Sequence, residues 1–398
     1  MGKLLDKYFP VEFRIIMGWV LVLIGIVVII PLTSFGIWKG LPSAPLGVVV
    51  LDKTVPNMDF QEHQSLHWLL NNLKYTKSDG SPYDPSEDYF GFFPGKNESY
   101  QIKDFSNLKA SEEERLVRDN QLFYFADTYG VYENDLKEVP LEAPSKKIYG
   151  GMDHSDLGIL KAALDNEKDV VIEFNNIASP TPKAVRREFE NLTDIKWTGW
   201  ITRYFDELDT VVNQEIPEWL IHGYIRQHGG DWYFKGSGMV FLHEDGQIEV
   251  LVFGDDFQND VPKILTMPAY QQQFKIPEIV NYPYWIDLML VSRDYEVVSY
   301  YDLKPTDQGL EKMRNWGIPR YFPAVVVKSN GKGKVYYFAG DFADNPIQTH
   351  AYHYYGIAKL WRMFLTAEDI SQRNSFFWNF YHPLMSSILE DCHERNQQ

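Results

Sequence analysis

The first pattern along the chain is an uncharged apolar run near the N-terminus. Residues Ile15–Trp38 read IIMGWVLVLIGIVVIIPLTSFGIW and contain no charge over 24 positions. A helix rises about 1.5 Å per residue, so this run is long enough to cross a hydrocarbon core of about 30 Å. We therefore predict a single transmembrane helix over 15–38, with Pro31 kinking it or marking its outer end. A cleaved signal peptide fits less well, because its apolar core is usually only about 7–15 residues long.

The charges that flank the apolar run indicate its orientation. Three basic residues precede the run within 1–14, whereas Lys39 and Lys53 follow it. The positive-inside rule then gives a small preference for a cytoplasmic N-terminus over 1–14. We expect a short Gly/Pro linker at 39–45 and the bulk of a single-pass protein outside the cytoplasm.

Beyond the linker, short apolar runs alternate with amphipathic patterns of about 10–15 residues. The runs LGVVVLDKTV, LFYFADTYGVY and DVVIEFNNIAS are apolar on both faces, as buried parallel strands are. Between them, EHQSLHWLLNNL, SDLGILKAALDNEK and TPKAVRREFENL place apolar residues along one helix face. We predict an α/β fold over 46–210, with a doubly wound, mostly parallel sheet that helices cover on both sides.

From about Pro217 the pattern changes to short aromatic strands separated by Gly-rich turns. The stretches HEDGQ and SNGKGK have the composition of hairpin turns. We expect a β-rich, aromatic insertion or second subdomain over 211–320. Residues 321–398 should then supply the final core strands, through FPAVVVKSNGKGKVYYFAGDFAD, and two aromatic C-terminal helices.

Polar side chains stand where the expected core strands end. Asp52, Asp127 and Glu173 close three strands, and an acidic corner follows the last strand. Ligands of parallel sheets bind outside the carboxyl ends of the strands, so we expect these acids along one rim. For any single acid, a turn cap or a solvated surface position is the alternative. The candidate ligand-binding residues are Asp52, Tyr129, Asn175, His154, Arg226, Asp255, Asp341 and Asp344.

The Gly-rich segment GYIRQHGGDWYFKGSG supplies the cationic candidate. Its backbone N–H groups, with Arg226 and Lys235, would suit an anionic or polyhydroxylated ligand, although such segments more often only turn the chain. Aromatic residues make up 15% of the chain and suit either a glycan groove or a core. The groove candidates are Trp197, Trp200, Tyr282, Tyr284 and Trp285.

Composition excludes several classes of site. The formal net charge of −17 argues against nucleic acid, which needs a basic surface. The single cysteine, Cys392, allows neither an intramolecular disulfide nor a thiolate metal cluster. His63 and His67 lie one helical turn apart, a spacing that suits zinc, but the surface of an amphipathic helix explains them better. No phosphate-binding loop occurs, so we expect neither a metal nor a cofactor.

The layout of these elements resembles the glutamine-amidotransferase-like branch of flavodoxin-like folds. The likeness rests on the strand ending in DTYGVY, the IYGG turn before a helix, and the strand ending in EFN, and it covers about 46–205 and 321–344. It is nearest in style to the extracytoplasmic versions attached to envelope transporters and polysaccharide systems. That class requires a cysteine on a tight strand-to-helix elbow, whereas Cys392 lies near the C-terminus. The resemblance therefore implies the fold without glutamine hydrolysis.

Three functions follow from the anchor and the resemblance. The first is a membrane-anchored, extracytoplasmic accessory protein that binds or handles a cell-envelope polysaccharide, beside a synthase or transporter partner. The second is a carbohydrate-active hydrolase or lyase, with Asp127 and Glu173 as the catalytic acids. The third is a structural subunit of an envelope ABC-type transporter.

Overall fold

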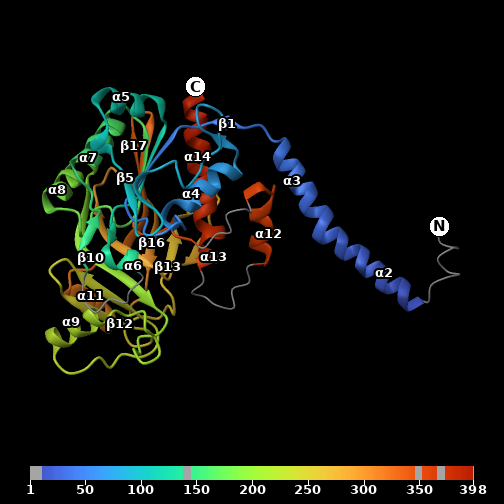
Figure 1. Ribbon diagram of the computed structural model, residues 1–398. Coiled ribbons are helices and arrows are strands. Elements are labelled where there is room, and N and C mark those ends of the chain that lie inside the picture. Colours follow the sequence, from blue (N-terminus) through green and yellow to red (C-terminus); the bar gives the residue numbers. More distant parts are fainter. Residues whose placement is uncertain (1–10, 138–144, 346–351, 365–372, 398) are drawn as a thin grey trace.

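A computed structural model describes residues 11–137, 145–345, 352–364 and 373–397 (Figure 1). It shows a mixed α/β protein with one large mixed sheet and a smaller antiparallel sheet. An apolar N-terminal helix projects away from the globular part (Figure 1). Residues 1–10 of the expected cytoplasmic N-terminus lie outside the described residues.

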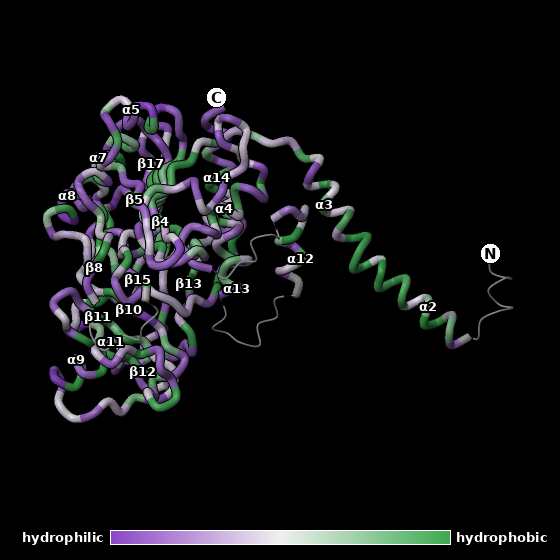
Figure 2. Tube along the Cα trace, viewed as in Figure 1, coloured by the Kyte–Doolittle hydropathy of each residue, from purple (hydrophilic) through white to green (hydrophobic). Residues whose placement is uncertain are grey.

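The N-terminal helix is continuous through α2 (Val11–Ile24), the π-helical turn η1 (Gly25–Ile29) and α3 (Ile30–Gly40). Pro31 lacks an N–H and crowds the carbonyl group four residues earlier, which accounts for the widened turn that precedes it. Residues Ile15–Gly40 form a helix of 26 residues, none of it buried, that is long and apolar enough to cross a membrane. Figure 2 shows α2 as hydrophobic along most of its length. A signal sequence near the N-terminus meets the same criteria of length and composition.

The large sheet has ten strands. Four pairings at its centre are parallel, and the other five pairings are antiparallel. The expectation of a mostly parallel sheet is therefore wrong for the sheet as a whole, because antiparallel strands are added on both sides of the parallel centre, four beyond β18 and one beyond β4. In spatial order the strands are β14 (Ile279–Asn281), β13 (Lys263–Thr266), β16 (Glu296–Asp302), β17 (Phe322–Asn330), β18 (Gly333–Phe338), β9 (Asp169–Ile172), β6 (Leu122–Asp127), β2 (Val48–Asp52), β4 (Phe90–Pro94) and β5 (Tyr100–Lys103).

The parallel centre is buried on both faces. Every residue of β2, β6 and β9 is buried, which agrees with their uninterrupted apolar sequences. Helix α4 (Gln61–Asn72) packs against α14 (His382–Gln397) on one side of the sheet. On the other side α7 (His154–Asp165) packs against α5 (Ala110–Asp119) and α8 (Lys183–Thr193) (Figure 1). These two helical layers fix the carboxyl ends of the parallel strands along one edge.

The four-stranded sheet orders its strands β12 (Ile248–Val252), β11 (Gly238–His243), β10 (Ile195–Phe205) and β15 (Trp285–Val291). Helix α9 (Glu218–His228) covers it over a second apolar core. The segment 211–320, expected as one insertion, thus divides between the sheets, since β13, β14 and β16 pair within the large sheet. Both expected hairpins form, β11 with β12 and β17 with β18.

The remaining elements are short. They are β1 (Ala44–Pro45), β3 (Tyr75–Thr76), η2 (Phe105–Asn107), β7 (Val131–Tyr132), α6 (Glu133–Lys137), β8 (Lys147–Tyr149), α10 (Pro268–Gln273), α11 (Asp307–Asn315), α12 (Ile357–Phe364), α13 (Arg373–Phe376) and η4 (Phe377–Tyr381).

Candidate functional site

The acids that close the parallel strands lie along one edge of the large sheet. Asp52 and Asp127 end β2 and β6 and are paired in register. Glu173 follows β9, and an acidic turn follows β18, the next strand along. The N-terminal turn of α4 adds a further acid, Glu62, whose carboxyl group has an oxygen within 4.8 Å of Asp341 and Asp344 in the acidic turn. We call this group the acidic rim: Asp52, Glu62, Asp127, Glu173, Asp341 and Asp344.

Asp52 is held by a buried histidine. Its Oδ2 lies 2.5 Å from Nδ1 of His63, whose Nε2 lies 2.8 Å from the carbonyl oxygen of Pro85. A carbonyl only accepts, so Nε2 donates, and a second proton must lie between Asp52 and His63. His63 and His67 are wholly buried, so the expectation of a surface position for them is wrong. Burial, and then repulsion from His63, lowers the pKa of His67 to about 4, which keeps it neutral.

Asp127 accepts hydrogen bonds from three directions. Oδ1 accepts from the hydroxyl of Thr54 and, at 2.5 Å, from the backbone N–H of Tyr129. Oδ2 accepts at 3.1 Å from the side-chain amide of Asn175, a residue in the left-handed region with φ of 64°. Burial raises the pKa of Asp127 to about 7 against these hydrogen bonds, and repulsion from Asp52 adds to the rise. Two of the predicted ligand-binding residues, Tyr129 and Asn175, thus orient Asp127.

Glu173 fastens the turn after β18. It accepts from the hydroxyl of Tyr124 and from the backbone N–H groups of Phe342 (3.2 Å) and Ala343 (3.0 Å). Its side chain is buried, and burial raises its pKa to about 8. Both carboxyl oxygens therefore contact protein atoms, and the residue joins β9 to the acidic turn.

The most exposed part of the rim is a triplet of carboxyls from two elements. Glu62, Asp341 and Asp344 each place an oxygen within 4.8 Å of the other two. Arg373 of α13 forms ion pairs with Asp344 and, at 3.6 Å, with Asp341. The guanidinium group lies 3.7 Å from the ring centre of Tyr284. Burial, and then repulsion from the aspartates around it, raises the pKa of Glu62 well above its usual range, although the side chain is partly exposed.

Protons supply most of the missing positive charge at the rim. Among the described lysine and arginine residues, Arg373 alone forms ion pairs with rim carboxylates. The six carboxyl groups of the rim therefore have one permanent cation among them. Carboxylate oxygens are ligands for hard cations, but the guanidinium already holds two members of the triplet. Burial raises the pKa of Glu62, Asp127, Glu173 and Asp341. Several rim carboxyls are therefore protonated near neutral pH and are able both to donate and to accept hydrogen bonds.

A second acidic cluster encloses a buried lysine. The Nζ of Lys53 lies 2.7 Å from Asp156, 2.8 Å from Asp153 and 3.9 Å from Asp104. Burial acts to lower the pKa of Lys53, but the carboxylates of Asp156 and Asp153 raise it overall. The hydroxyl of Tyr149 donates to Asp104 at 2.6 Å. The ammonium group thus fills the space between these carboxylates, so the cluster is a structural ion-pair network.

Three predicted ligand-binding residues belong to other parts of the fold. His154 begins α7, and its exposed ring contacts Glu188 of α8 at 3.2 Å. Arg226 is exposed on α9, above the four-stranded sheet. Asp255 is exposed in the turn after β12. In the described contacts none of these three side chains touches the acidic rim: Arg226 and Asp255 lie beside the four-stranded sheet, and His154 faces α8.

Most of the expected glycan-groove aromatics fill the interior. Trp200 and Tyr282 are buried in the main core. Trp197 is partly buried against that core. Tyr284 is the exception at the rim, where its ring supports Arg373. The core interpretation of these aromatics is therefore the better one.

Sequence reasoning missed Glu62, Lys53 and Arg373, and it considered His63 as a zinc ligand or a surface residue without its contact to Asp52. Glu62, His63 and Lys53 follow from a simple rule, since the loop and helix that follow a central parallel strand start at its carboxyl end. Lys53 and the start of α4 come directly after β2. Arg373 arrives from the C-terminal region, and no local pattern marks it.

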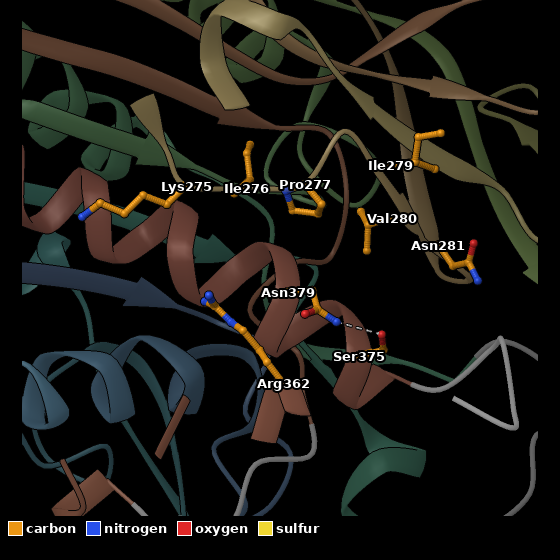
Figure 3. A pocket seen from close by; sticks show the side chains of 9 residues that line it. All are labelled: Lys275, Ile276, Pro277, Ile279, Val280, Asn281, Arg362, Ser375 and Asn379. Carbon is orange, nitrogen blue, oxygen red and sulfur yellow. Dashed lines mark hydrogen bonds between the residues drawn. The ribbon is translucent and has the colours of Figure 1, made fainter. Parts of the chain in front are cut away.

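A surface hollow of about 520 Å³ lies beside the C-terminal helices (Figure 3). One wall is the segment from Lys275 to Asn281. The other wall contains Arg362, Ser375 and Asn379, and the amide of Asn379 donates to the Ser375 hydroxyl at 3.2 Å. The hollow contains no residue of the acidic rim.

Comparison with known proteins assigns no family. No family model matches the chain, and no curated protein matches it. Among solved structures, a β-galactosidase from Bacillus circulans sp. alkalophilus aligns at 10% identity and a TM-score of 0.31, over 75% of this chain and 30% of that chain. A cold-adapted β-galactosidase from Rahnella sp. R3 aligns at 8% identity and a TM-score of 0.31, over 74% and 28%. Similarity this low carries no inference about activity.

Proposed function

We propose that this chain is a membrane-anchored accessory protein of the cell envelope that binds a polysaccharide at the acidic rim. Its bulk then lies outside the cytoplasm, and its partner is a polysaccharide synthase or transporter. The proposal includes an amidotransferase-like arrangement without the nucleophile. The run of parallel neighbours β4, β2, β6, β9 and β18 supports that arrangement. The only cysteine, Cys392, is buried within α14.

The observation that carries the proposal is the excess of carboxyls over basic groups at the rim. A carboxyl that is protonated donates one hydrogen bond and accepts others, as a sugar hydroxyl does. Neutral carboxyls also avoid the large cost of holding several charges in a partly dry site. The partly exposed Glu62 lies beside Arg373's carboxylate partners, Asp341 and Asp344, and the guanidinium group of Arg373 lies over the aromatic ring of Tyr284. Carboxyl groups that both donate and accept hydrogen bonds, together with one aromatic ring, suit a polyhydroxylated ligand.

Substitution of Glu62 tests polysaccharide binding. Glu62→Gln keeps the shape of the side chain and removes its ionisation, so the fold is retained. The amide N–H is a weaker hydrogen-bond donor than the acid O–H that it replaces, so binding should weaken by up to about tenfold, the effect of one strong hydrogen bond. The measurement is binding of full-length protein in lipid nanodiscs to peptidoglycan sacculi and to neutral and anionic capsular polysaccharides.

The matched control is Asp165→Asn, an exposed acid on α7 paired with Lys161. It should bind as the unsubstituted protein does. Equal affinity of the Glu62→Gln and Asp165→Asn variants for every polymer, or no binding by any form, refutes the rim as a glycan site. Co-purification with an ABC-type complex in the absence of glycan binding would instead favour the transporter-subunit function.

A hydrolase is the second candidate, and one observation favours it. Glu62 combines partial exposure with a strongly raised pKa, which are properties of a general acid, and it faces two aspartates. Glu173, by contrast, has both oxygens in contact with protein donors. Release of new reducing ends that is lost in both Asp127→Asn and Glu62→Gln would identify the enzyme. Loss in Glu173→Gln with unchanged stability would restore the originally expected catalytic pair.

A further inference from the structure

The segment 352–364 is fixed to the outer end of the N-terminal helix. The hydroxyl of Ser34 donates to the carbonyl of Tyr355 at 2.8 Å, and the Tyr355 N–H donates back to the Ser34 carbonyl at 3.4 Å. Trp38 packs edge-on against the rings of Tyr352 (6.0 Å) and His353 (4.8 Å). Two hydrogen bonds and a group of rings thus join segments about 320 residues apart in sequence. Figure 1 shows α12 beside α3, between it and the globular part.

The attachment point lies at a defined depth along the apolar helix. Ser34 precedes Lys39, the first charge after the uncharged run, by five residues, or about 7.5 Å of helix. A bilayer is about 40–45 Å thick with its headgroups and about 30 Å without them, so each headgroup layer is about 5–8 Å deep. A helix that spans the membrane with Lys39 in water therefore places Ser34, and with it Tyr355, in the headgroup layer.

The composition of the segment suits that layer. Between 352 and 364 there are two permanent cations, Lys359 and Arg362, and no acid, in a chain of net charge −17. The exposed apolar side chains of this segment are large: Tyr355 is 56% exposed, Leu360 47% and Trp361 36%. Tyrosine and tryptophan favour the membrane interface, and basic residues favour anionic headgroups.

We propose that residues 352–364 lie in the outer headgroup layer as a second membrane contact, with an anionic phospholipid layer as its partner. The partner follows from the attachment to α3 and from the complementary charge. This inference rests on the part of the proposed function in which the N-terminal helix spans the membrane. It is independent of glycan binding, and it gives the globular part a defined orientation to the bilayer, which one flexible attachment does not.

Depth-dependent fluorescence quenching tests the contact. The full chain is reconstituted into vesicles of phosphatidylcholine and phosphatidylglycerol, with an environment-sensitive dye on one introduced cysteine. Cys392 is fully buried, so the chain without an added cysteine is the labelling control. The three sites are Leu360→Cys on α12, Ile26→Cys in the apolar helix, and Ser111→Cys on α5. Ser111 is exposed, and Figure 1 places α5 at the end of the globular part away from α12.

Brominated phosphatidylcholine should quench the dyes at Leu360→Cys and Ile26→Cys and leave the dye at Ser111→Cys bright. Quenching at Leu360→Cys should weaken at least twofold in vesicles without phosphatidylglycerol, because the attraction of Lys359 to the anionic headgroups is lost, whereas Arg362 also donates to the carbonyl oxygen of Trp378 at 2.8 Å. A dye at Leu360→Cys as bright as at Ser111→Cys, with Ile26→Cys quenched, overturns the second contact and leaves the anchor intact. If Ile26→Cys is also bright, the anchor itself is refuted. Shielding of Leu360→Cys only in native membranes would identify a protein partner and overturn the lipid proposal.

Discussion

A single buried carboxyl shows how this fold accommodates charge. Asp287 of β15 is fully buried, and its Oδ2 accepts from the hydroxyl of Tyr337 at 2.7 Å. Its Oδ1 has no hydrogen-bond partner among the described residues. Burial raises the pKa of Asp287 to about 7, so ionisation above that pH opposes folding.

Since this cost of ionisation grows as the pH rises from the unfolded pKa to the folded pKa, we expect Asp287→Asn to stabilise the protein by about 2–3 kcal/mol more at pH 8 than at pH 5. The reason is that asparagine keeps the acceptor for Tyr337 and has no charge to bury. Urea unfolding at the two pH values measures the effect, with Asp165→Asn at an exposed position as the control. An equal change at both pH values would contradict this origin.

Removal of the cation from the second acidic cluster should destabilise the protein, in contrast to Asp287→Asn. Lys53→Met leaves Asp104, Asp153 and Asp156 without the ammonium group between them. We expect the free energy of unfolding to fall by about 3–5 kcal/mol, the usual cost of breaking a buried pair from one side. Addition of Asp156→Asn to the same chain should recover part of the loss, whereas a purely additive double variant would argue against the network.

Sequence reasoning located the acids at this scale but not their partners. Asp52, Asp127, Glu173 and Asp341 follow from the rule that parallel strands end at one edge, and the structure gathers them there. The ligand role expected of them stays a prediction. Arg373 was out of reach because a long-range contact that depends on the packing of α13 leaves no trace in local periodicity.

At the scale of elements, one contact of α14 ties the C-terminus to the central sheet. The guanidinium group of Arg395 donates to both oxygens of Asp169, at 2.8 Å and 2.7 Å, at the start of β9. Asp169 is buried, and it also accepts from the backbone N–H of Lys334 at 2.7 Å. The pair therefore joins α14, β9 and the β17–β18 hairpin.

Arg395→Met should lower the free energy of unfolding by about 1–3 kcal/mol, because it leaves a buried carboxylate without its charged donor. Its control is Lys275→Met, which breaks only the exposed pair with Glu390 and should change stability by less than about 1 kcal/mol. Chemical denaturation of both variants provides the comparison. Equal effects would show that α14 docks through its apolar face alone.

The strands show which features of the secondary structure can be predicted from the hydrophobic pattern. The strands β2, β6 and β9 could be predicted because burial on both faces leaves them apolar except for one aspartate at an end of each strand. Which sheet β13, β14 and β16 would join could not be predicted, since short, partly buried strands fit the edge of either sheet equally well. The large sheet is mixed because tertiary packing places these strands beside β17 and not in the smaller sheet.

At the scale of the whole molecule, the shifted pKa values of the buried groups together make the free energy of unfolding depend on pH. The pKa of Asp127, Asp156 and Asp287 rises from 3.8 to about 7, and that of Glu173 from 4.5 to about 8. An acid with a raised folded-state pKa contributes stability below its unfolded pKa and loses it as the pH rises through the folded value. Burial lowers the pKa of His67 to about 4 and of His382 to about 3, and these groups act only below about pH 6.5.

Between pH 6.5 and pH 8 the acids act without that opposition, so stability should fall as the pH rises, by a total on the order of 2–5 kcal/mol. The measurement is urea unfolding of the full chain in detergent at intervals of pH across that window. Below pH 6.5 the two histidines oppose the acids and the profile should flatten. A stability that rises from pH 6.5 to pH 8 is the result that this account cannot accommodate.

The short connection after α3 limits where the protein can work. Helix α3 ends at Gly40, and strand β1, which pairs with β3, begins at Ala44, so only three residues are free to extend. At about 3.5 Å per residue they allow the globular part a travel of roughly 10 Å. If α3 is embedded, a mature wall polymer some distance away is out of range, and only a strand that is just leaving the bilayer would meet the rim.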